Sequence, residues 1–215
     1  MALTEQDLLQ NIPAAPWCNI KGTLPQAIAH RGFKARYPEN SLRAMQEAVE
    51  VGAHALETDV HLTADGVVVL SHDPTLKRCF GKEDRIKDCL WEDIAPLRST
   101  RKPSEPMARL VDLLEWLAHP TRQDTWVLLD IKTDDEAHAL ITAVGKALAS
   151  VKSSTPWKHR IMLGCWNATF IKTAAALLPG YAISHISFSL HYSRSFMNIP
   201  NVGFNMLQRR LAGPF

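Results

Sequence analysis

Residues 55–73 read ALETDVHLTADGVVVLSHD and predict two strands, 55–62 and 67–71, separated by the turn residues Ala64, Asp65 and Gly66. Because side chains alternate across a strand, Glu57 and Asp59 share one face of the first strand, and His61 follows on the same face. Two carboxylates so placed lie about 7 Å apart along the backbone and can both reach one divalent cation. The alternative is a solvated strand face.

Outward from this stretch, short apolar runs alternate with amphipathic helical patterns. The alternation of strand and helix favours an α/β fold with a parallel sheet. One predicted helix begins near residue 42, and three others span residues 110–117, 136–151 and 169–178. The predicted strands are 27–31, 55–62, 67–71, 125–131, 160–165, 181–188 and 202–206.

The positions of the polar residues distinguish an open sheet from a closed barrel. No glycine-rich turn of the dinucleotide-binding type follows the first strand. Polar residues instead occur at the ends of several strands, which is typical of a (β/α)8 TIM-type barrel. We therefore expect an N-terminal extension over 1–24 and one barrel domain over 25–215, with a small loop-rich insertion at about 74–107.

Composition narrows the class of protein. The 215 residues are 46% hydrophobic and 21% charged, with a net charge of +2, so no nucleic-acid partner is indicated. The N-terminus lacks the features of a signal peptide, and no apolar run is long enough to span a membrane. The four cysteines form no C-x-x-C pair and are expected to be reduced thiols. These features predict a cytoplasmic protein. They leave two points open, namely peripheral contact with lipid surfaces and the oligomeric state.

The segment LLDIK, residues 128–132, supplies a third acid. Asp130 and Lys132 share one face of their strand, which is unusual for packing. Asp130 would complete an oxygen cage with the two acids of the earlier strand, and such a cage favours Mg²⁺ or Ca²⁺ over zinc. Lys132 would meet an anion. An internal salt bridge between Asp130 and Lys132 is the alternative.

Two histidines, His30 and His72, each end an apolar run. A pair of imidazoles can serve as general base and general acid, although a lone histidine at a strand end is usually structural. The guanidinium of Arg31 has the geometry that binds phosphate oxygens. Strand alternation would place Arg31 and His30 on opposite faces, unless Gly32 ends the strand and turns both toward one site. An anionic phosphodiester would balance the positive charge that Arg31, Lys132, the imidazoles and the cation bring to the site.

The ordered elements HRG, PENS, ETDVHLTADGVVVLSHDPTL and LLDIK resemble the glycerophosphodiester phosphodiesterase family over about residues 27–132. The later stretches GCWNATFIKTAAALLPG and ISHISFSLHYSRSF look most like the fungal branch similar to phosphatidylglycerol phospholipase C. The resemblance implies a metal-dependent phosphodiester hydrolase built on a (β/α)8 barrel, with an insertion after the third strand.

The resemblance also assigns roles to individual residues. It implies an acid/base pair, a phosphate-binding pair and one divalent cation, Mg²⁺ or Ca²⁺, with a cyclic phosphate formed by attack of the glycerol 2-hydroxyl. The assignments are His30 and His72 for catalysis, Arg31 and Lys132 for the phosphate, and Glu57, Asp59 and Asp130 for the cation. Glu39 and Asn40 of the PEN element are interpreted as shaping the loop and capping the helix.

Two departures from the family pattern leave alternatives open. The family usually has Glu where this chain has Asp130, and it continues into an eighth strand, so the barrel is expected to be truncated. One hypothesis is hydrolysis of a glycerophosphodiester or of a glycerophospholipid, such as phosphatidylglycerol to diacylglycerol and glycerol phosphate. The other is a catalytically impaired barrel that only binds a phosphorylated ligand or partner. Phe33, Phe80 and Trp166 are candidate lipid contacts.

Overall fold

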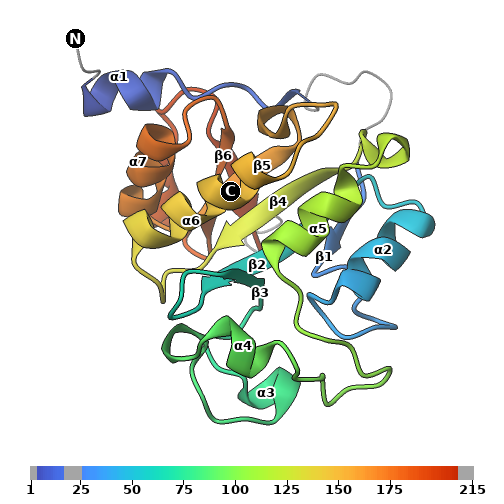
Figure 1. The fold of residues 1–215 in the computed structure, drawn as a ribbon. Helices are drawn as coiled ribbons and strands as arrows, with labels where there is room; N and C mark the ends of the chain where they lie inside the picture. The colour runs from blue at the N-terminus through green and yellow to red at the C-terminus, as the bar shows by residue number, and fades with distance from the viewer. Residues whose placement is uncertain (1–3, 17–25, 208–215) are drawn as a thin grey trace.

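The computed structural model describes residues 4–16 and 26–207 (Figure 1). Its centre is a sheet whose main path runs β1-β2-β4-β5-β6-β7, and all neighbours on this path are parallel. The fold is therefore the predicted α/β class, seen as a parallel half-barrel of the TIM type. The strands are β1 (Ile28–His30), β2 (Ala55–Leu62), β4 (Trp126–Ile131), β5 (Ile161–Cys165), β6 (Ala182–Ser187) and β7 (Gly203–Met206).

The predicted third barrel strand has a different place in the structure. β3 (Val68–Leu70) pairs antiparallel with the end of β2, where Val60 is opposite Leu70, and it lies off the main path. The turn between the two strands is too short for the crossover that a parallel pair requires. The described residues thus contain the seven predicted strands, of which six are parallel and the third runs antiparallel to β2.

Helices cover the outer face of the sheet (Figure 1). They are α2 (Leu42–Glu50), α5 (Leu110–Leu117), α6 (Ala137–Ser150) and α7 (Ala168–Leu177), followed by the short α8 (Leu190–Ser193). Local capping sets where they begin. Ser41 Oγ accepts a hydrogen bond from the Ala44 amide at the start of α2, and the Glu136 carboxylate caps α6. Outward-facing residues such as Leu56, Leu129 and Leu163 pack in the main core with these helices.

The inner face of the sheet changes character along the strands. At its amino end, Ala55, Trp126, Leu128 and Ala182 form a separate apolar cluster. Because side chains two residues apart share a face, the acids at positions 57, 59 and 130 continue the same face toward the carboxyl end. The fold therefore places these carboxylates where TIM-type barrels carry their sites.

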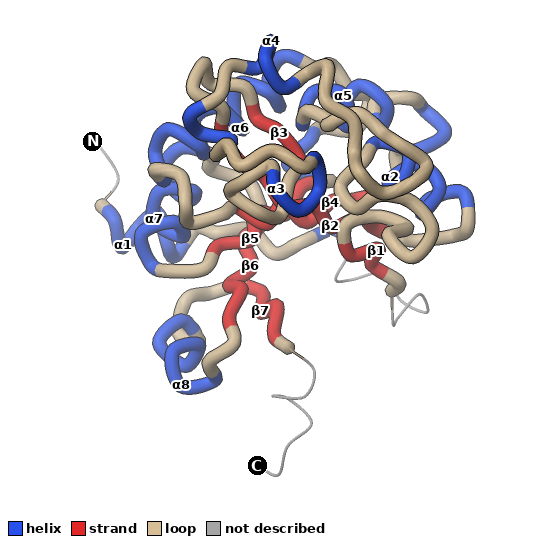
Figure 2. The backbone as a smooth tube through the Cα atoms, turned by 90° about the horizontal axis from the view of Figure 1, so that it is seen from below, coloured by secondary structure: helices blue, strands red, loops and turns tan. Residues whose placement is uncertain are grey.

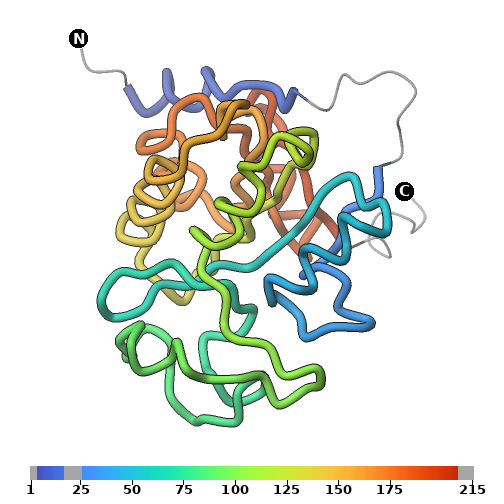
Figure 3. The backbone as a smooth tube through the Cα atoms, turned by 45° about the vertical axis from the view of Figure 1, so that its right-hand side comes forward, coloured from blue at the N-terminus to red at the C-terminus, as the bar shows by residue number. Residues whose placement is uncertain are grey.

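Residues 74–107 form an irregular lobe at the end of the molecule opposite α1 (Figures 1 and 3). The lobe contains α3 (Lys77–Phe80), the 3-10 helix η2 (Ile86–Asp88) and α4 (Trp91–Ile94). A small apolar cluster that includes Leu76, Ile86 and Ile94 gives it a core of its own. Its identification with the insertion of the family stays a prediction.

The N-terminal residues 4–16 pack on the domain and do not stand apart from it. α1 (Glu5–Gln10) lies against α7, and Glu5 forms an ion pair with Lys172. Ile12 is buried in the main core, and Asn201 Nδ2 donates a hydrogen bond to its carbonyl oxygen at 2.9 Å. Residues 17–24 of the predicted extension lie outside the described residues.

The two ends of the strand path are edges within the described part of the chain (Figure 2). β1 pairs with β2 alone and β7 with β6 alone, and both edge strands carry exposed apolar side chains. Within residues 4–16 and 26–207, no helix has the length and apolar character needed to cross a membrane. Cys79, Cys89 and Cys165 carry free thiols, and Cys18 lies outside the described residues.

Candidate active site

Three carboxylates meet on the inner face, where β2 and β4 lie side by side. Glu57 and Asp59 alternate along β2, and the register of the sheet pairs Asp59 with Asp130. One oxygen of each residue lies within 4.8 Å of the others, and all three residues are buried. The structure thus brings these three acids together as the sequence predicts, and we call them the acid cluster.

Lys132 lies among the acids, one residue beyond the end of β4. Its Nζ is 2.7 Å from Asp59 Oδ1 and 2.6 Å from Asp130 Oδ2. Burial acts to lower the pKa of Lys132, but the attraction of Asp130 and Asp59 raises this pKa above its ordinary value. The internal salt bridge that the sequence left as an alternative is therefore present, and the phosphate contact of Lys132 stays a prediction.

The pKa of Glu57 shows that the acid cluster has an excess of negative charge. Burial raises the pKa of Glu57 to about 8, and repulsion from Asp59 and Asp130 adds to the effect. The Arg31 amide donates a hydrogen bond to Glu57 Oε2 at 3.0 Å, which acts in the opposite direction. Such a group favours either a proton on Glu57 or a bound cation. Carboxylate oxygens are the ligands of hard cations, so this donor set fits Mg²⁺ or Ca²⁺.

Asn40 holds Asp59 in place and does not cap α2. Its Nδ2 donates to Asp59 Oδ2 at 2.8 Å, while its Oδ1 accepts from Thr58 Oγ1 at 2.8 Å. The N-cap is Ser41, so the interpretation of Asn40 as the residue that caps the helix was wrong. Arg31 Nε lies 3.2 Å from Asp59 Oδ2 on the same side. Asn40 therefore belongs to the site, because it orients one of the acids.

Trp166, which the sequence indicated only as a candidate lipid contact, contacts the acid cluster. It follows the end of β5, and its indole Nε1 donates to Asp130 Oδ1 at 2.6 Å. The Lys132 ammonium lies 5.5 Å from the centre of a Trp166 ring, and the Phe188 ring lies 5.2 Å away. The available signal was its position just beyond a strand, which had singled out the two histidines.

The other two aromatic residues proposed as lipid contacts do not join Trp166. Phe33 packs against the main core and makes an edge contact with the ring of Tyr37. Phe80 packs against the small cluster of the 74–107 lobe. The three aromatic residues therefore form no common surface.

The chain turns sharply after His30, as the prediction for Gly32 requires. β1 ends at His30, and Arg31 and Gly32 have φ angles of 59° and 76°. A Cβ atom on Gly32 would lie 2.6 Å from the carbonyl carbon of Ala44, so only glycine fits here. The turn leaves His30 Nε2 3.8 Å from Glu57 Oε2.

His30 is held loosely on the side away from the acids. The Lys34 ammonium donates to His30 Nδ1 at 2.9 Å, and the imidazole side chain is 55% exposed. Burial, Lys34 and Arg31 lower the pKa of His30.

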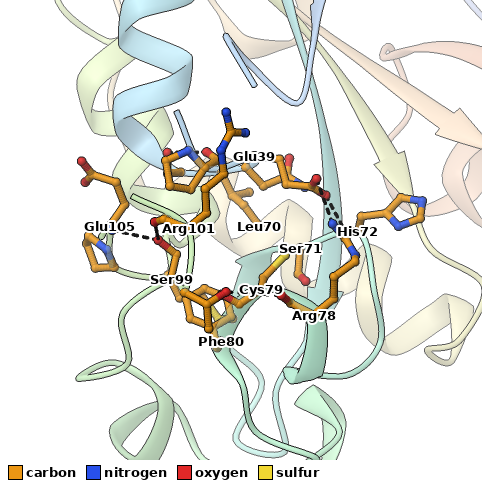
Figure 4. Close-up of a pocket in the computed structure, with 16 residues that line it drawn as sticks. Glu39, Leu70, Ser71, His72, Arg78, Cys79, Phe80, Ser99, Arg101 and Glu105 are labelled. Carbon is orange, nitrogen blue, oxygen red and sulfur yellow. Dashed lines mark hydrogen bonds and ion pairs between the residues drawn. The ribbon is translucent and has the colours of Figure 1, made fainter. Parts of the chain in front are cut away.

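His72 lies in a chain of ion pairs (Figure 4). Its Nδ1 is 2.7 Å from Asp73 Oδ1, and Arg78 Nε donates to Asp73 Oδ2 at 2.6 Å. Arg78 also binds both oxygens of Glu39, at 2.8 and 2.9 Å. We call His72, Asp73, Arg78 and Glu39 the His72 clamp. Sequence reasoning assigned no chemistry to the last three, because their pairing depends on contacts between distant segments.

The His72 clamp is connected to the acid cluster through one residue. Arg31 Nη1 donates to Glu39 Oε1 at 3.0 Å, while its Nε faces Asp59. All seven residues assigned from the sequence therefore lie in or next to one network of polar contacts.

A cavity of about 160 Å³ adjoins the His72 clamp. Figure 4 shows Ser71, Cys79 and Phe80 on one side of the Arg78–Glu39 pair and the His72 imidazole on the other. Burial raises the pKa of Cys79, so its thiol stays protonated near neutral pH. The three acids are not among the lining residues of the cavity, but Asn40, which binds Asp59, is one of them.

The sequence of the chain is similar to sequences of known proteins. The model of the glycerophosphoryl diester phosphodiesterase family matches residues 30–200. A glycerophosphodiester phosphodiesterase of Caldanaerobacter subterraneus is 29% identical over 167 residues, which cover 77% of this chain and 65% of that protein. Human glycerophosphodiester phosphodiesterase 1 is 32% identical over 124 residues, or 56% of this chain and 37% of the human protein. The chain thus spans less than two thirds of the length of these two relatives.

Solved structures show the same fold. A phosphodiesterase of Oleispira antarctica, in complex with the product sn-glycerol-3-phosphate, has a TM-score of 0.71 at 22% identity, covering 86% of this chain and 76% of that one. A glycerophosphodiester phosphodiesterase of Thermotoga maritima has a TM-score of 0.65 at 23% identity, covering 84% and 72%. Because the family model covers most of its length, the chain belongs to the glycerophosphoryl diester phosphodiesterase family.

Proposed function

We propose that the protein hydrolyses a phosphodiester in which one of the two alcohols is glycerol. The observation that carries the proposal is the buried acid cluster, which lies next to His30 and is joined to the His72 clamp through Arg31. In this proposal Glu57, Asp59 and Asp130 hold one divalent cation. The cation, when bound, stabilises negative charge on the phosphate oxygens.

The proposed roles of the histidines follow from their contacts. Asp73 accepts from Nδ1 of His72, which leaves the Nε2 of this imidazole to exchange a proton with the substrate. One histidine takes the proton of the glycerol 2-hydroxyl as its oxygen bonds to phosphorus. The other gives a proton to the leaving oxygen as its bond to phosphorus breaks, and water then opens the cyclic phosphate.

Arg31 and Lys132 are the proposed phosphate contacts. Both carry positive charge beside the acids, and the guanidinium of Arg31 has the fork that suits phosphate oxygens. Lys132 already neutralises Asp59 and Asp130, so a part in charge balance is compatible with its contacts as well. Replacing Lys132 by Gln and measuring KM separately from kcat distinguishes the two parts.

The proposed substrates are small glycerophosphodiesters, with glycerophospholipids such as phosphatidylglycerol as the second candidate. The Oleispira relative holds glycerol phosphate, which supports the first. The Phe188 ring, which lies tilted against Trp166 beside the acid cluster and is 63% exposed, favours the second. The fungal phospholipase-like branch, a cytoplasmic location and peripheral contact with lipid surfaces belong to this second proposal.

The first experiment offers glycerophosphocholine and phosphatidylglycerol vesicles to the protein with Mg²⁺ or Ca²⁺ and measures glycerol phosphate. We expect cation-dependent hydrolysis, which His30→Gln and His72→Gln reduce by about 10²-fold or more. His159→Gln is the matched control, because His159 is exposed in the 3-10 helix η4 (Trp157–His159), which precedes β5. Binding of glycerol phosphate without hydrolysis of either substrate would contradict the proposal and favour a barrel that only binds its ligand.

A further inference from the structure

A buried pair, His61 and Asp135, lies beside the proposed site but has no assigned part in it. His61 follows Glu57 and Asp59 on the same face of β2. The pairing of β2 with β4 ends at Val60, so His61 lies just beyond the parallel sheet. Asp135 belongs to the loop between β4 and α6, the same loop that carries Lys132.

The contact between the two side chains is short and shielded from water. His61 Nδ1 is 2.8 Å from Asp135 Oδ2, and the Leu62 amide donates to the same oxygen at 3.3 Å. The side chains of His61 and Asp135 are only 2% and 4% exposed. A polar pair buried this deeply costs stability unless each group finds a partner, so the orientation of the His61 imidazole is closely fixed.

The second nitrogen of His61 faces the backbone of a proposed catalytic residue. His61 Nε2 lies 3.4 Å from the carbonyl oxygen of His72. Both neighbours of the imidazole, a carboxylate and a carbonyl, are acceptors, so a nitrogen that carries a proton has an acceptor beside it. His61 therefore connects the loop after β4 to the loop after β3.

The backbone around His72 has one other tie to β2. The Ser71 amide donates to the carbonyl oxygen of Asp59 at 3.1 Å, on the side of His72 that precedes it in the chain. Asp73 contacts the imidazole of His72, and Ser71 Oγ donates to the Asp73 carbonyl oxygen at 3.0 Å, a local contact that does not itself reach β2. The contact from His61 does constrain the His72 backbone from β2, and displacement of a reacting group by about 1 Å can cost on the order of 10²-fold in rate.

We propose that His61 and Asp135 are positioning residues, which hold the backbone of His72 in register with the acid cluster. The proposal rests on the proposed function, because it gives the pair a part in the reaction through His72. It assigns neither residue a contact with substrate or cation. His61 lies within the motif ETDVHLTADGVVVLSHDPTL that carries the family resemblance, but the resemblance implies no role for it.

Two variants of His61 separate its two contacts. His61→Gln keeps an amide donor near the position of Nε2 and loses the contact with Asp135. His61→Asn keeps a donor near Nδ1 and loses the reach to the His72 carbonyl. We expect His61→Asn to lower kcat for glycerophosphocholine by about 10- to 100-fold with KM nearly unchanged. We expect His61→Gln to stay within about threefold of the wild-type protein, and His159→Asn is the control at an exposed histidine.

A readout that needs no substrate keeps the positioning proposal separate from the proposed function. The imidazole resonances of His72 are recorded by NMR in the wild-type protein and in both variants. We expect them to move in His61→Asn and to remain close to wild type in His61→Gln. If the wild-type protein hydrolyses nothing, the proposed function fails, while the NMR comparison still tests the pair.

Equal loss of kcat in the two variants, or unchanged His72 resonances in folded His61→Asn, would overturn the proposal in favour of a purely structural pair. Should His61→Asn not fold, Asp135→Asn takes its place, because its amide oxygen can still accept from His61 Nδ1. The proposal then expects a partial movement of the His72 resonances and a smaller loss of kcat. Resonances and kcat that both match the wild-type protein would again reject it.

Discussion

In the His72 clamp one arginine lies between two carboxylates, whereas in the acid cluster three carboxylates share Lys132 and one contact from Arg31. Arg78 binds Asp73 and Glu39, and Arg31 supplies a second positive charge beside Glu39. Lys132 reaches only Asp59 and Asp130, which leaves Glu57 outside its contacts. The first region is electrostatically complete, and the second is short of positive charge.

The pKa values of the two regions move in opposite directions. Hydrogen bonding from Arg78 lowers the pKa of Asp73 to about 2, although burial acts against it. Burial and the neighbouring acids raise the pKa of Glu57 to about 8. The clamp therefore holds a histidine, whereas the charge of the acid cluster suits a bound cation.

The largest expected effect comes from removing the positive charge of Lys132 from the acid cluster, and removal of Arg78 from the His72 clamp is its comparison. Lys132→Met leaves three buried acids without their ammonium and should lower the free energy of unfolding by about 3–5 kcal/mol. Arg78→Met should cost about 1 kcal/mol or less, because its side chain is half exposed and its partners keep other cations. Urea unfolding at pH 8 with divalent cations chelated measures both, with Lys152→Met as an exposed control. Equal losses in the two variants would remove the distinction between the regions.

A divalent cation should have the next largest effect, and only on the acid cluster. In the cation-free protein, Glu57 keeps its proton in the folded state up to about pH 8 but loses it near 4.5 when unfolded. Stability should therefore fall as pH rises from about 4.5 to 8, by on the order of a few kcal/mol. Saturating Mg²⁺ or Ca²⁺ should restore it, because the bound cation favours ionised Glu57.

Glu57→Gln tests this dependence directly. The variant should lose most of the pH-dependent fall, because the amide does not titrate, and it should gain little from added cation. Glu115→Gln, an exposed acid on α5, should behave like the wild-type protein. Thermal unfolding over pH 5–8.5 with and without cation provides the measurement, and a fall that persists in Glu57→Gln would count against the raised pKa of this residue.

The sequence predicts the acid cluster well because strand periodicity is a local property. Alternation along ETD and LLDIK puts Glu57, Asp59 and Asp130 on one face, and adjacent parallel strands then bring them together. The turn at Gly32 was also readable, because a glycine after two polar residues can end a strand.

The clamp was less accessible, because its members come from three separate segments. Glu39, Asp73 and Arg78 meet only after the loop before α2 packs against α3, and no period in the sequence encodes that packing. The direction of β3 was missed for a related reason. A run of apolar residues predicts a strand, but its direction depends on the length of the connection before it.

Trp166→Phe sharpens the comparison with a smaller effect inside the acid cluster. The change removes the hydrogen bond from Nε1 to Asp130 Oδ1 and should cost about 1.5 kcal/mol, as expected for a bond to a charged group. Trp116→Phe on α5 controls for the loss of ring area. Urea unfolding at pH 7 compares them, and equal costs would mean that the indole hydrogen bond contributes nothing beyond packing.

Acid titration of the clamp should give the smallest effect, and it runs opposite to that of the acid cluster. Because the pKa of Asp73 falls from 3.8 to about 2 on folding, its stabilisation is present above about pH 4 and is lost as pH falls through 2. Asp73→Asn should therefore unfold about 2 °C below the wild-type protein at pH 5, and this gap should close toward pH 2. The corresponding gap for cation-free Glu57→Gln should instead open as pH rises above 4.5. Gaps that open or close together would show that the two regions share one electrostatic balance.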